Sequence, residues 1–300
     1  MAATPPRILS EPRVVGDVRA TLGEGLCWSP TAQALWWVDI LEHRLYRDGP
    51  AGAHDAWSFD ETISAVAERA GGAGLAVTLR RGLALFDPAT DALVRLDEPE
   101  REREGNRFND GKCDAHGRFW GGTMDFAVRA PTGALYRFDA SGRAQRAIDL
   151  GWIVTNGPTW TQDGRTMLVN DTVHRRVVAY AFDPATGAVG ASREWLALPP
   201  ADGHPDGMTT DAAGRIWIAH WGGACVTCHD ADGAAELARI ALPTDHITNV
   251  AFGGPDMTTL FISSAKFELG DAQRAAQPLA GALFAVETDA LGLAANLFAG

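Results

Sequence analysis

Lysine is almost absent from this chain of 300 residues. Of the 26 basic residues only Lys112 and Lys266 are lysine, and 38 acidic residues bring the net charge to -12 at pH 7. A chain this acidic is repelled by nucleic acids and by anionic membranes, so neither is expected as a partner. No stretch holds the roughly 18 consecutive apolar residues of a membrane-spanning helix. We therefore expect no membrane span.

Signals for export and long helices are also missing. Residues 1–13 lack the apolar core of a secretion signal, so a cytoplasmic location is expected. The four cysteines are then expected to be free thiols. Two of them occur in the segment 225–229, Cys-Val-Thr-Cys-His, which has the spacing of covalent haem attachment. Its position in a predicted strand favours a structural role instead.

Six short β-rich runs recur along the chain, and their starts are 39, 44, 48, 49 and 44 residues apart. The runs are 36–39, 75–78, 119–122, 167–170, 216–219 and 260–263. A period of about 40–50 residues with roughly four strands is typical of propeller blades. We therefore predict an all-β protein, a six-bladed β-propeller with about four antiparallel strands per blade. Residues 1–300 are expected to form this single domain, with one chain end adding a strand to the blade of the other end.

A polar residue precedes each run by 10 to 12 positions. These residues are Glu24, Ser64, Asn109, Asn156, Asp206 and Asn249. They fall in the strand that should line the central channel, where quasi-symmetry places equivalent positions at one height. Buried polar groups left unpaired cost about 1–3 kcal/mol each, so this ring needs partners. A hard cation is one such partner for carboxylate and amide oxygens; ordered channel water with hydrogen bonds between blades is the alternative.

Five motifs carry a resemblance to a known family. They are Leu-Gly-Glu-Gly at 22–25, Arg-Phe-Asn-Asp-Gly-Lys at 107–112, Gly-Thr-Met at 122–124, Asn-Gly at 156–157 and Pro-Asp-Gly-Met at 205–208. In these motifs the chain resembles the senescence-marker-protein/gluconolactonase family, which includes regucalcin and bacterial sugar lactonases. The match extends over essentially the full length. It implies a six-bladed propeller, in agreement with the repeat count.

The resemblance also implies a site. One divalent metal ion is held by residues that correspond here to Glu24, Asn156 and Asp206. Residues that contact the substrate correspond to Arg107 and Asn109. The Asp110-Gly111 pair that follows is of a type common in turns.

Two positions depart from the family pattern. Pro158 follows Asn156-Gly157, where family members generally carry Leu or a similar apolar residue. Ala127 stands three residues after the Gly-Thr-Met motif, where some members carry Glu, and the nearest carboxylate is Asp125. These departures concern the wall that would contact the sugar, so they leave the substrate open.

The implied reaction is hydrolysis of a sugar lactone to the aldonic acid. With Ca²⁺, Zn²⁺, Mn²⁺, Mg²⁺ or Fe²⁺ as a Lewis acid at the lactone carbonyl, water attacks the carbonyl carbon and Asp206 serves as the base. Glu24 and Asn156 hold the ion, while Arg107 and Asn109 orient the lactone oxygens. Further candidates for contacts near the site are Asp125, Asp171, His204, Ser64 and Asn249, each of which also has a simple structural explanation.

Two other functions fit the same scaffold. One is a metal-dependent esterase or phosphotriesterase, which would share the ring and differ at the rim. The other is a non-enzymatic calcium-binding or protein-binding propeller, because propellers host many functions. The pair Arg107 and Asn109 favours an enzyme for small molecules. Trp152 and Trp221, at predicted loop positions, are candidates for stacking on a sugar.

Overall fold

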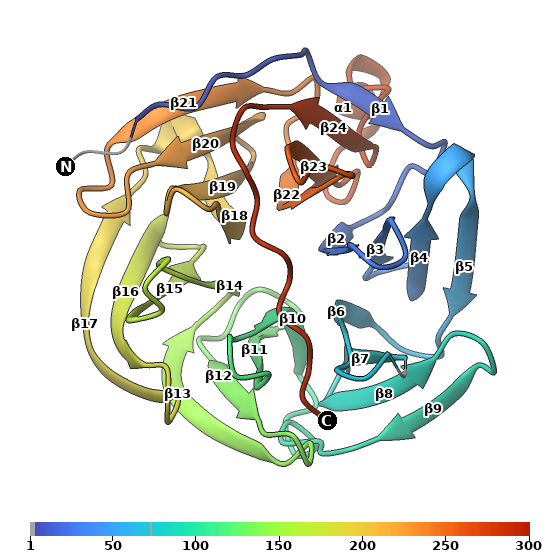
Figure 1. Cartoon of the computed structure of the whole chain (residues 1–300), viewed down its shortest axis with the longest axis vertical. Coiled ribbons are helices and arrows are strands. Elements are labelled where there is room, and N and C mark those ends of the chain that lie inside the picture. The colour runs from blue at the N-terminus through green and yellow to red at the C-terminus, as the bar shows by residue number, and fades with distance from the viewer. Residues whose placement is uncertain (1–3, 73) are drawn as a thin grey trace.

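Six four-stranded antiparallel sheets stand in a ring around a central channel (Figure 1). The computed structural model describes residues 4–72 and 74–300. The predicted six-bladed β-propeller is confirmed, and each of the six aligned runs forms the second strand of its blade. The innermost strands contact one another in sequence around the ring, so they line the channel.

The strands are ordered from the channel outward. The innermost strands are β2 (Gly23–Ser29), β6 (Ile63–Glu68), β10 (Asn106–Cys113), β14 (Thr155–Trp160), β18 (His204–Thr210) and β22 (Ile247–Gly253). The second strands are β3 (Ala34–Asp39), β7 (Leu75–Leu79), β11 (Phe119–Asp125), β15 (Thr166–Asp171), β19 (Ile216–Trp221) and β23 (Thr259–Ser264). The third strands are β4 (Arg44–Asp48), β8 (Leu83–Asp87), β12 (Gly133–Phe138), β16 (Arg176–Asp183), β20 (Cys225–His229) and β24 (Leu283–Glu287). The outermost strands are β5 (His54–Ser58), β9 (Ala92–Arg95), β13 (Ala144–Trp152), β17 (Ala188–Ala197), β21 (Glu236–Ala241) and β1 (Arg13–Val15).

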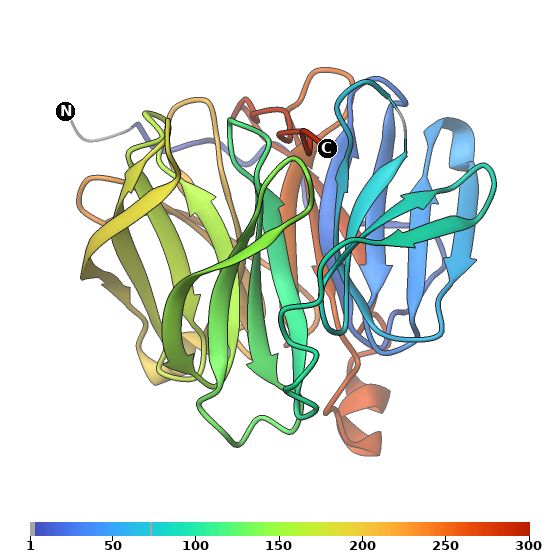
Figure 2. The same ribbon diagram turned by 90° about the horizontal axis from the view of Figure 1, so that it is seen from below.

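The two ends of the chain close the ring in the sixth blade. Strand β1 pairs antiparallel with β24, with Arg13 opposite Ala285 and Val15 opposite Leu283. The N-terminal strand is therefore the outermost strand of the last blade, which confirms the expected exchange. One short α-helix, α1 (Asp271–Ala276), projects from the connection between β23 and β24 (Figure 2). Among the described residues no helix has the length and apolar character needed to cross a bilayer.

Tryptophan fills the space between blades. Trp37, Trp120 and Trp217 lie on second strands and are at most 1% exposed. Both faces of each blade pack against a neighbour, so the inner and second strands are apolar on both sides. The four cysteines are buried as well, and all of them are free thiols. Strand β20 carries Cys225 and Cys228, and both ring nitrogens of the adjacent His229 are hydrogen bonded, to Ala234 O and Thr227 Oγ1.

Every innermost strand is interrupted by a β-bulge at the predicted polar ring. The pairing register shifts between Glu24 and Cys27, Ile63 and Ala65, Phe108 and Gly111, Asn156 and Thr159, Pro205 and Met208, and Ile247 and Val250. A bulge releases residues from the ladder and re-aims their side chains. Glycine permits it: Gly25 and Gly157 follow two ring residues with φ of 62° and 83°. The peptide bond between Gly157 and Pro158 is cis.

The turn suggested by Asp110-Gly111 does not form, because β10 continues to Cys113 through its bulge. Asp110 turns into the channel instead. Its Oδ1 accepts a hydrogen bond from Gly111 N at 2.7 Å, and its Oδ2 accepts one from Gly157 N of the next blade at 2.9 Å. The carboxylate therefore ties two blades together, which a turn at the edge of a sheet could not do.

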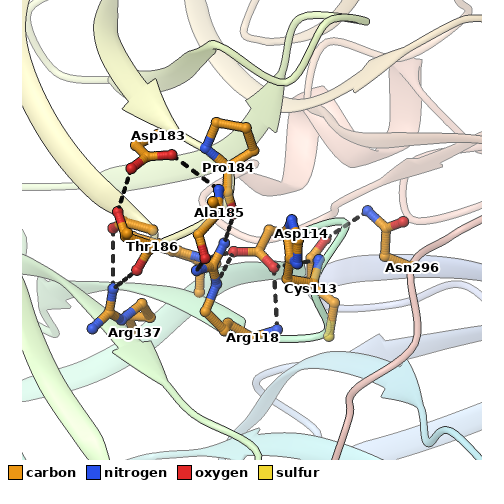
Figure 3. Close-up of polar contacts among 12 residues, drawn as sticks. Cys113, Asp114, Arg118, Arg137, Asp183, Pro184, Ala185, Thr186 and Asn296 are labelled. Carbon is orange, nitrogen blue, oxygen red and sulfur yellow. Dashed lines mark hydrogen bonds and ion pairs between the residues drawn. The ribbon is translucent and has the colours of Figure 1, made fainter.

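The C-terminal segment crosses one face of the ring (Figures 1 and 2). Leu293 and Asn296 line a cavity of about 240 Å³ on that face. The side chain of Asn296 donates to Cys113 O at 3.1 Å, and nearby Arg118 donates to Asp114 Oδ2 and to Pro184 O of the next blade (Figure 3). The Asn296 bond holds the segment against the third blade, and the Arg118 bond to Pro184 O links the third blade to the fourth.

Candidate active site

The opposite mouth of the channel, on the side of α1, opens into a pocket of about 260 Å³. Its floor brings together five predicted side chains from four blades, all between 2% and 7% exposed. They are Glu24, Arg107, Asn109, Asn156 and Asp206. The bulges make this convergence possible, since they release residues of the innermost strands from regular pairing and let their polar side chains point into the channel.

The two carboxylates on the floor resist ionisation. Burial raises the pKa of Glu24 to about 8, and the nearby Asp110 carboxylate adds to the rise against opposing hydrogen bonds from Asn249 and Gly25. Burial also raises the pKa of Asp206 well above its ordinary value, with repulsion from Glu24 and Asp110 in the same direction. Arg107 offsets part of both shifts. Extra positive charge would favour ionisation of both carboxylates.

Arg107 is held by its neighbours along β10. Its Nη1 donates to Asn109 Oδ1 at 2.5 Å and to Phe108 O at 3.0 Å. Its guanidinium carbon lies 5.6 Å from the ring centre of Phe126. Burial lowers its pKa to about 10, against the opposing effect of Glu24 and Asp206. The side chain is still cationic at neutral pH, with donors left to face the pocket.

Asn109 connects Arg107 to Asn156 on the floor of the pocket. Its Nδ2 donates to Asn156 Oδ1 at 2.6 Å and to Thr155 O at 3.1 Å, while its Oδ1 accepts from Arg107. Asn156 in turn donates from Nδ2 to Thr172 Oγ1 at 3.0 Å. These bonds fix both amide orientations, so the oxygen of Asn156 faces Asn109 and retains a second lone pair.

The donor set on the floor fits a divalent cation. Glu24, Asn156 and Asp206 offer two carboxylates and one amide, the hard oxygen ligands that Ca²⁺ and similar ions prefer. A cation would also oppose the effects of burial and of repulsion between carboxylates, which raise the pKa of Glu24 and Asp206. Among the described residues no three His, Cys, Asp or Glu side chains cluster as a metal site, so the set depends on the Asn156 amide.

Four other candidates lie outside the pocket lining. Ser64 Oγ pairs with Thr78 Oγ1 at 2.9 Å inside the second blade. Asp171 forms an ion pair with Arg176 and a hydrogen bond with His174. Asp125 Oδ2 accepts from the backbone N–H groups of residues 129 and 130, at 2.7 and 2.9 Å. These three contacts are structural.

Asn249, the fourth, lines the opposite cavity but reaches Glu24. Its Nδ2 donates to Glu24 Oε2 at 2.7 Å, and Gly25 N donates to the same oxygen at 3.1 Å. Gly207 lets this neighbour approach, because a Cβ at Gly207 would lie 2.5 Å from the Asn249 amide. Asn249 is therefore placed to orient Glu24 from behind.

Two rim candidates do line the pocket. His204 faces it from β18, with Nδ1 donating to Thr172 O at 2.9 Å. Trp221 lies directly opposite His204 on β19 and stacks on His246 at 4.0 Å. Trp152, by contrast, packs in the apolar layer between the third and fourth blades. Of the two tryptophans named from the sequence, only Trp221 is placed to meet a ligand.

The model of the SMP-30/Gluconolactonase/LRE-like region matches residues 22–266, from the start of the floor motifs to the rim beside α1. This chain belongs to the SMP-30/gluconolactonase family.

Relatives of this SMP-30/gluconolactonase protein are similar over nearly the whole chain. Pentonolactonase XacC of Haloferax volcanii is 37% identical over 93% of this chain and 95% of its own. L-arabinolactonase of Azospirillum brasilense is 33% identical over 96% and 95%. The crystal structure of the calcium-binding protein regucalcin from Agrobacterium tumefaciens superposes with a TM-score of 0.90, at 30% identity over 99% of both chains.

Sequence reasoning missed two charged residues of this SMP-30/gluconolactonase protein. Asp110 is a third buried carboxylate beside Glu24 and Asp206, and burial raises its pKa against the effects of Lys112 and two backbone N–H groups. Lys112 donates to Met208 O, and burial lowers its pKa. The available signal was their place in the sequence, since Asp110 and Lys112 closely follow the ring position Asn109 in a strand that lines the channel.

Proposed function

We propose that the protein hydrolyses sugar lactones to aldonic acids at the pocket on the α1 side, with one divalent ion bound by Glu24, Asn156 and Asp206. The observation that carries the proposal is the convergence of these three residues with Arg107 and Asn109 on one floor. The pentonolactonase and arabinolactonase relatives support a lactone as the substrate.

The floor residues have separate tasks in this reaction. Arg107 directs its free donors at the lactone oxygens, and Asn109 keeps the guanidinium in place through the 2.5 Å bond. An ion held between Glu24, Asn156 and Asp206 would polarise the carbonyl and lower the pKa of adjacent water. Water oxygen bonds to the carbonyl carbon, and the ring C–O bond breaks. Asp206 takes the proton from the water and returns it to the ring oxygen, which yields the hydroxy acid.

The geometry suits Asp206 as the base. No side-chain donor of the described residues bonds its carboxylate, whereas Glu24 is bonded by Asn249. Asp206 also follows His204 by two positions on β18, so both side chains face the same pocket. Its backbone O is fixed by a hydrogen bond from the Asn170 side chain. The carboxylate is thus anchored at its main chain and open at its oxygens.

The test uses protein stripped of metal and resupplied with one divalent ion at a time. Acid release from a panel of pentono- and hexonolactones should exceed the spontaneous rate only with a bound ion. Asp206→Asn and Glu24→Gln should each lower kcat/KM by at least about 100-fold. Glu236→Gln, which removes an exposed carboxylate paired with Arg239 on β21, is the matched control and should retain activity.

Calorimetric titration with the same ions gives a second readout that does not require turnover. Wild type and Glu236→Gln should bind one equivalent, and Glu24→Gln should bind far more weakly. Binding without hydrolysis of any lactone would contradict the enzymatic proposal and favour a calcium-binding propeller. Hydrolysis of aryl esters or phosphotriesters in preference to every lactone would favour the esterase alternative.

A further inference from the structure

Exposed apolar side chains gather at the mouth of the pocket. Phe126, Val128 and Phe267 are 42%, 43% and 38% exposed, and all three line it. Large apolar side chains on a surface are usually scattered, and a cluster of them marks a binding site. The other large exposed hydrophobic residues of the described chain, such as Leu9 and Leu93, lie away from this mouth.

Val128 is held in an unfavourable backbone conformation to reach the mouth. Its φ is 55°, and it is the one β-branched residue with positive φ in the described part of the chain. This conformation is unfavourable for a residue with a Cβ, because the Cβ lies too close to a backbone carbonyl oxygen. The loop maintains it, since Val128 N donates to Asp125 O at 3.0 Å and the Asp125 carboxylate caps the residues that follow. Strain of this kind is characteristic of functional sites.

The upper walls offer few polar partners to a polyhydroxylated ligand. Above the floor the polar groups lining the pocket are the side chains of Thr172, His204 and Glu268 and the indole N–H of Trp221. Thr172 Oγ1 is already engaged, because it donates to Pro205 O at 2.9 Å and accepts from Asn156. His204 uses Nδ1 on Thr172 O, which leaves Nε2 as an acceptor. The polar groups left for a ligand, on His204, Trp221 and Glu268, all lie on the fifth- and sixth-blade side.

The opposite side of the mouth is apolar throughout. The third blade supplies Met124, Phe126 and Val128, and the first supplies Leu22 and Leu41. A hydroxyl pressed against this side would lose water partners and gain no polar partner from the protein. A methyl group in the same place would bury apolar surface.

We propose that the preferred substrate is a deoxy-aldonolactone, whose terminal carbon is a methyl group in place of a hydroxymethyl group. The inference rests on the proposed lactonase function and names its substrate class. The lactone carbonyl must lie on the floor, beside Arg107 and Asp206. The terminal carbon is the atom farthest from that carbonyl, so it reaches the mouth, which Phe126 and Val128 line from the third blade and Phe267 from the sixth.

The experiment compares matched lactones that differ by one hydroxyl. The pairs are 6-deoxygalactono- with galactono-1,4-lactone and 6-deoxymannono- with mannono-1,4-lactone, assayed with the metal-loaded enzyme. Discrimination of one such group is typically 10- to 200-fold in kcat/KM, and because the mouth is partly open we expect about 10-fold in favour of the deoxy member. Erythrono-1,4-lactone has no exocyclic carbon, so its kcat/KM depends on the residues of the floor and not on those of the mouth.

Variants then assign the preference to the mouth. Val128→Asn adds a polar group with little risk to folding, because Asn tolerates positive φ better than valine does. Val128→Asn and Phe267→Gln should each reduce the deoxy preference at least about threefold and leave kcat/KM for erythronolactone unchanged. Phe126 is left intact because its ring contacts Arg107. Leu93→Asn, on β9 and as exposed as Phe267, is the control and should change nothing.

The outcomes separate this inference from the proposed function. Hydrolysis of erythronolactone with no preference within the pairs, or with the hydroxylated member preferred, would overturn the inference and leave the lactonase intact. A deoxy preference that persists in both mouth variants would also overturn it. No hydrolysis of any lactone with any ion would overturn both.

Discussion

The side-chain amide of Asn109 donates to Oδ1 of Asn156 at 2.6 Å and joins the two halves of the candidate site. On one side Asn109 holds Arg107, which is proposed to bind the lactone. On the other it fixes the oxygen that Asn156 is proposed to present to a metal ion. One side chain thereby sets the distance between the substrate-binding group and the ion-binding group.

Removal of Asn109 should therefore act through Arg107. We expect Asn109→Ala to lower kcat/KM by about 10- to 100-fold, because the buried guanidinium loses its 2.5 Å acceptor. The double variant Asn109→Ala/Arg107→Ala should be no worse than Arg107→Ala alone, since residues that work as one unit are not additive. Steady-state kinetics of the three variants on one lactone measure this coupling. Additive losses would show that Asn109 acts on the substrate independently.

Asn249 should control metal affinity without touching the pocket. Its Nδ2 bonds Glu24 Oε2 at 2.7 Å, so it orients a proposed ligand from behind. Loss of such a supporting contact typically weakens metal binding 10- to 100-fold. We expect this loss in Asn249→Ala by calorimetric titration, with kcat restored at saturating metal. Ser64 occupies the equivalent ring position, and its side chain bonds Thr78. The control variant Ser64→Ala should therefore bind the metal with unchanged affinity. Equal losses in both variants would argue against a specific role.

The C-terminal segment should contribute strongly to stability through a single residue. Phe298 is fully buried among residues that include Phe108 and Phe119, whereas the preceding Leu297 is 44% exposed. Phe298→Ala should lower the free energy of unfolding by about 3–5 kcal/mol. Leu297→Ala should change it by less than about 0.5 kcal/mol. Urea unfolding followed by tryptophan fluorescence compares the pair, and equal effects would show that the segment is not anchored by Phe298.

Stability should fall on mild acidification because of a buried histidine in the fifth blade. Burial lowers the pKa of His220 to about 4, where its ring lies between Asp202 O and Thr227 Oγ1. The unfolded chain takes up this proton near pH 6.5 and the folded protein only near pH 4, so stability is lost as the pH falls through that window. The expected contribution is about 2 kcal/mol between pH 7 and pH 5.

The matched variants for this effect are His220→Gln and His116→Gln, the latter at an exposed turn. Urea unfolding at pH 7 and pH 5 should show a smaller loss on acidification in His220→Gln than in wild type. His116→Gln should behave like wild type. An identical loss in all three proteins would assign the acid sensitivity to other groups.

Much of the site could be predicted because the bulge positions recur. Glu24, Asn109, Asn156 and Asp206 stand 10 to 12 positions before an apolar run, and each lies in an innermost strand at its bulge. Spacing could not show which ring members share a pocket. Ser64 satisfies the same spacing but turns to Thr78 within its own blade. Side-chain contacts in the folded blade decide such differences, and the spacing along the chain does not encode them.

By itself, the sequence determined the number of blades and the height of the polar ring, because both depend on periodicity along the chain. The apolar mouth was decided only in three dimensions. Phe126, Val128 and Phe267 come from loops of two different blades, and the left-handed conformation of Val128 depends on the capping of its loop by Asp125. Contacts between loops of separate blades have no period and no fixed spacing. They exist only once six sheets close around one axis.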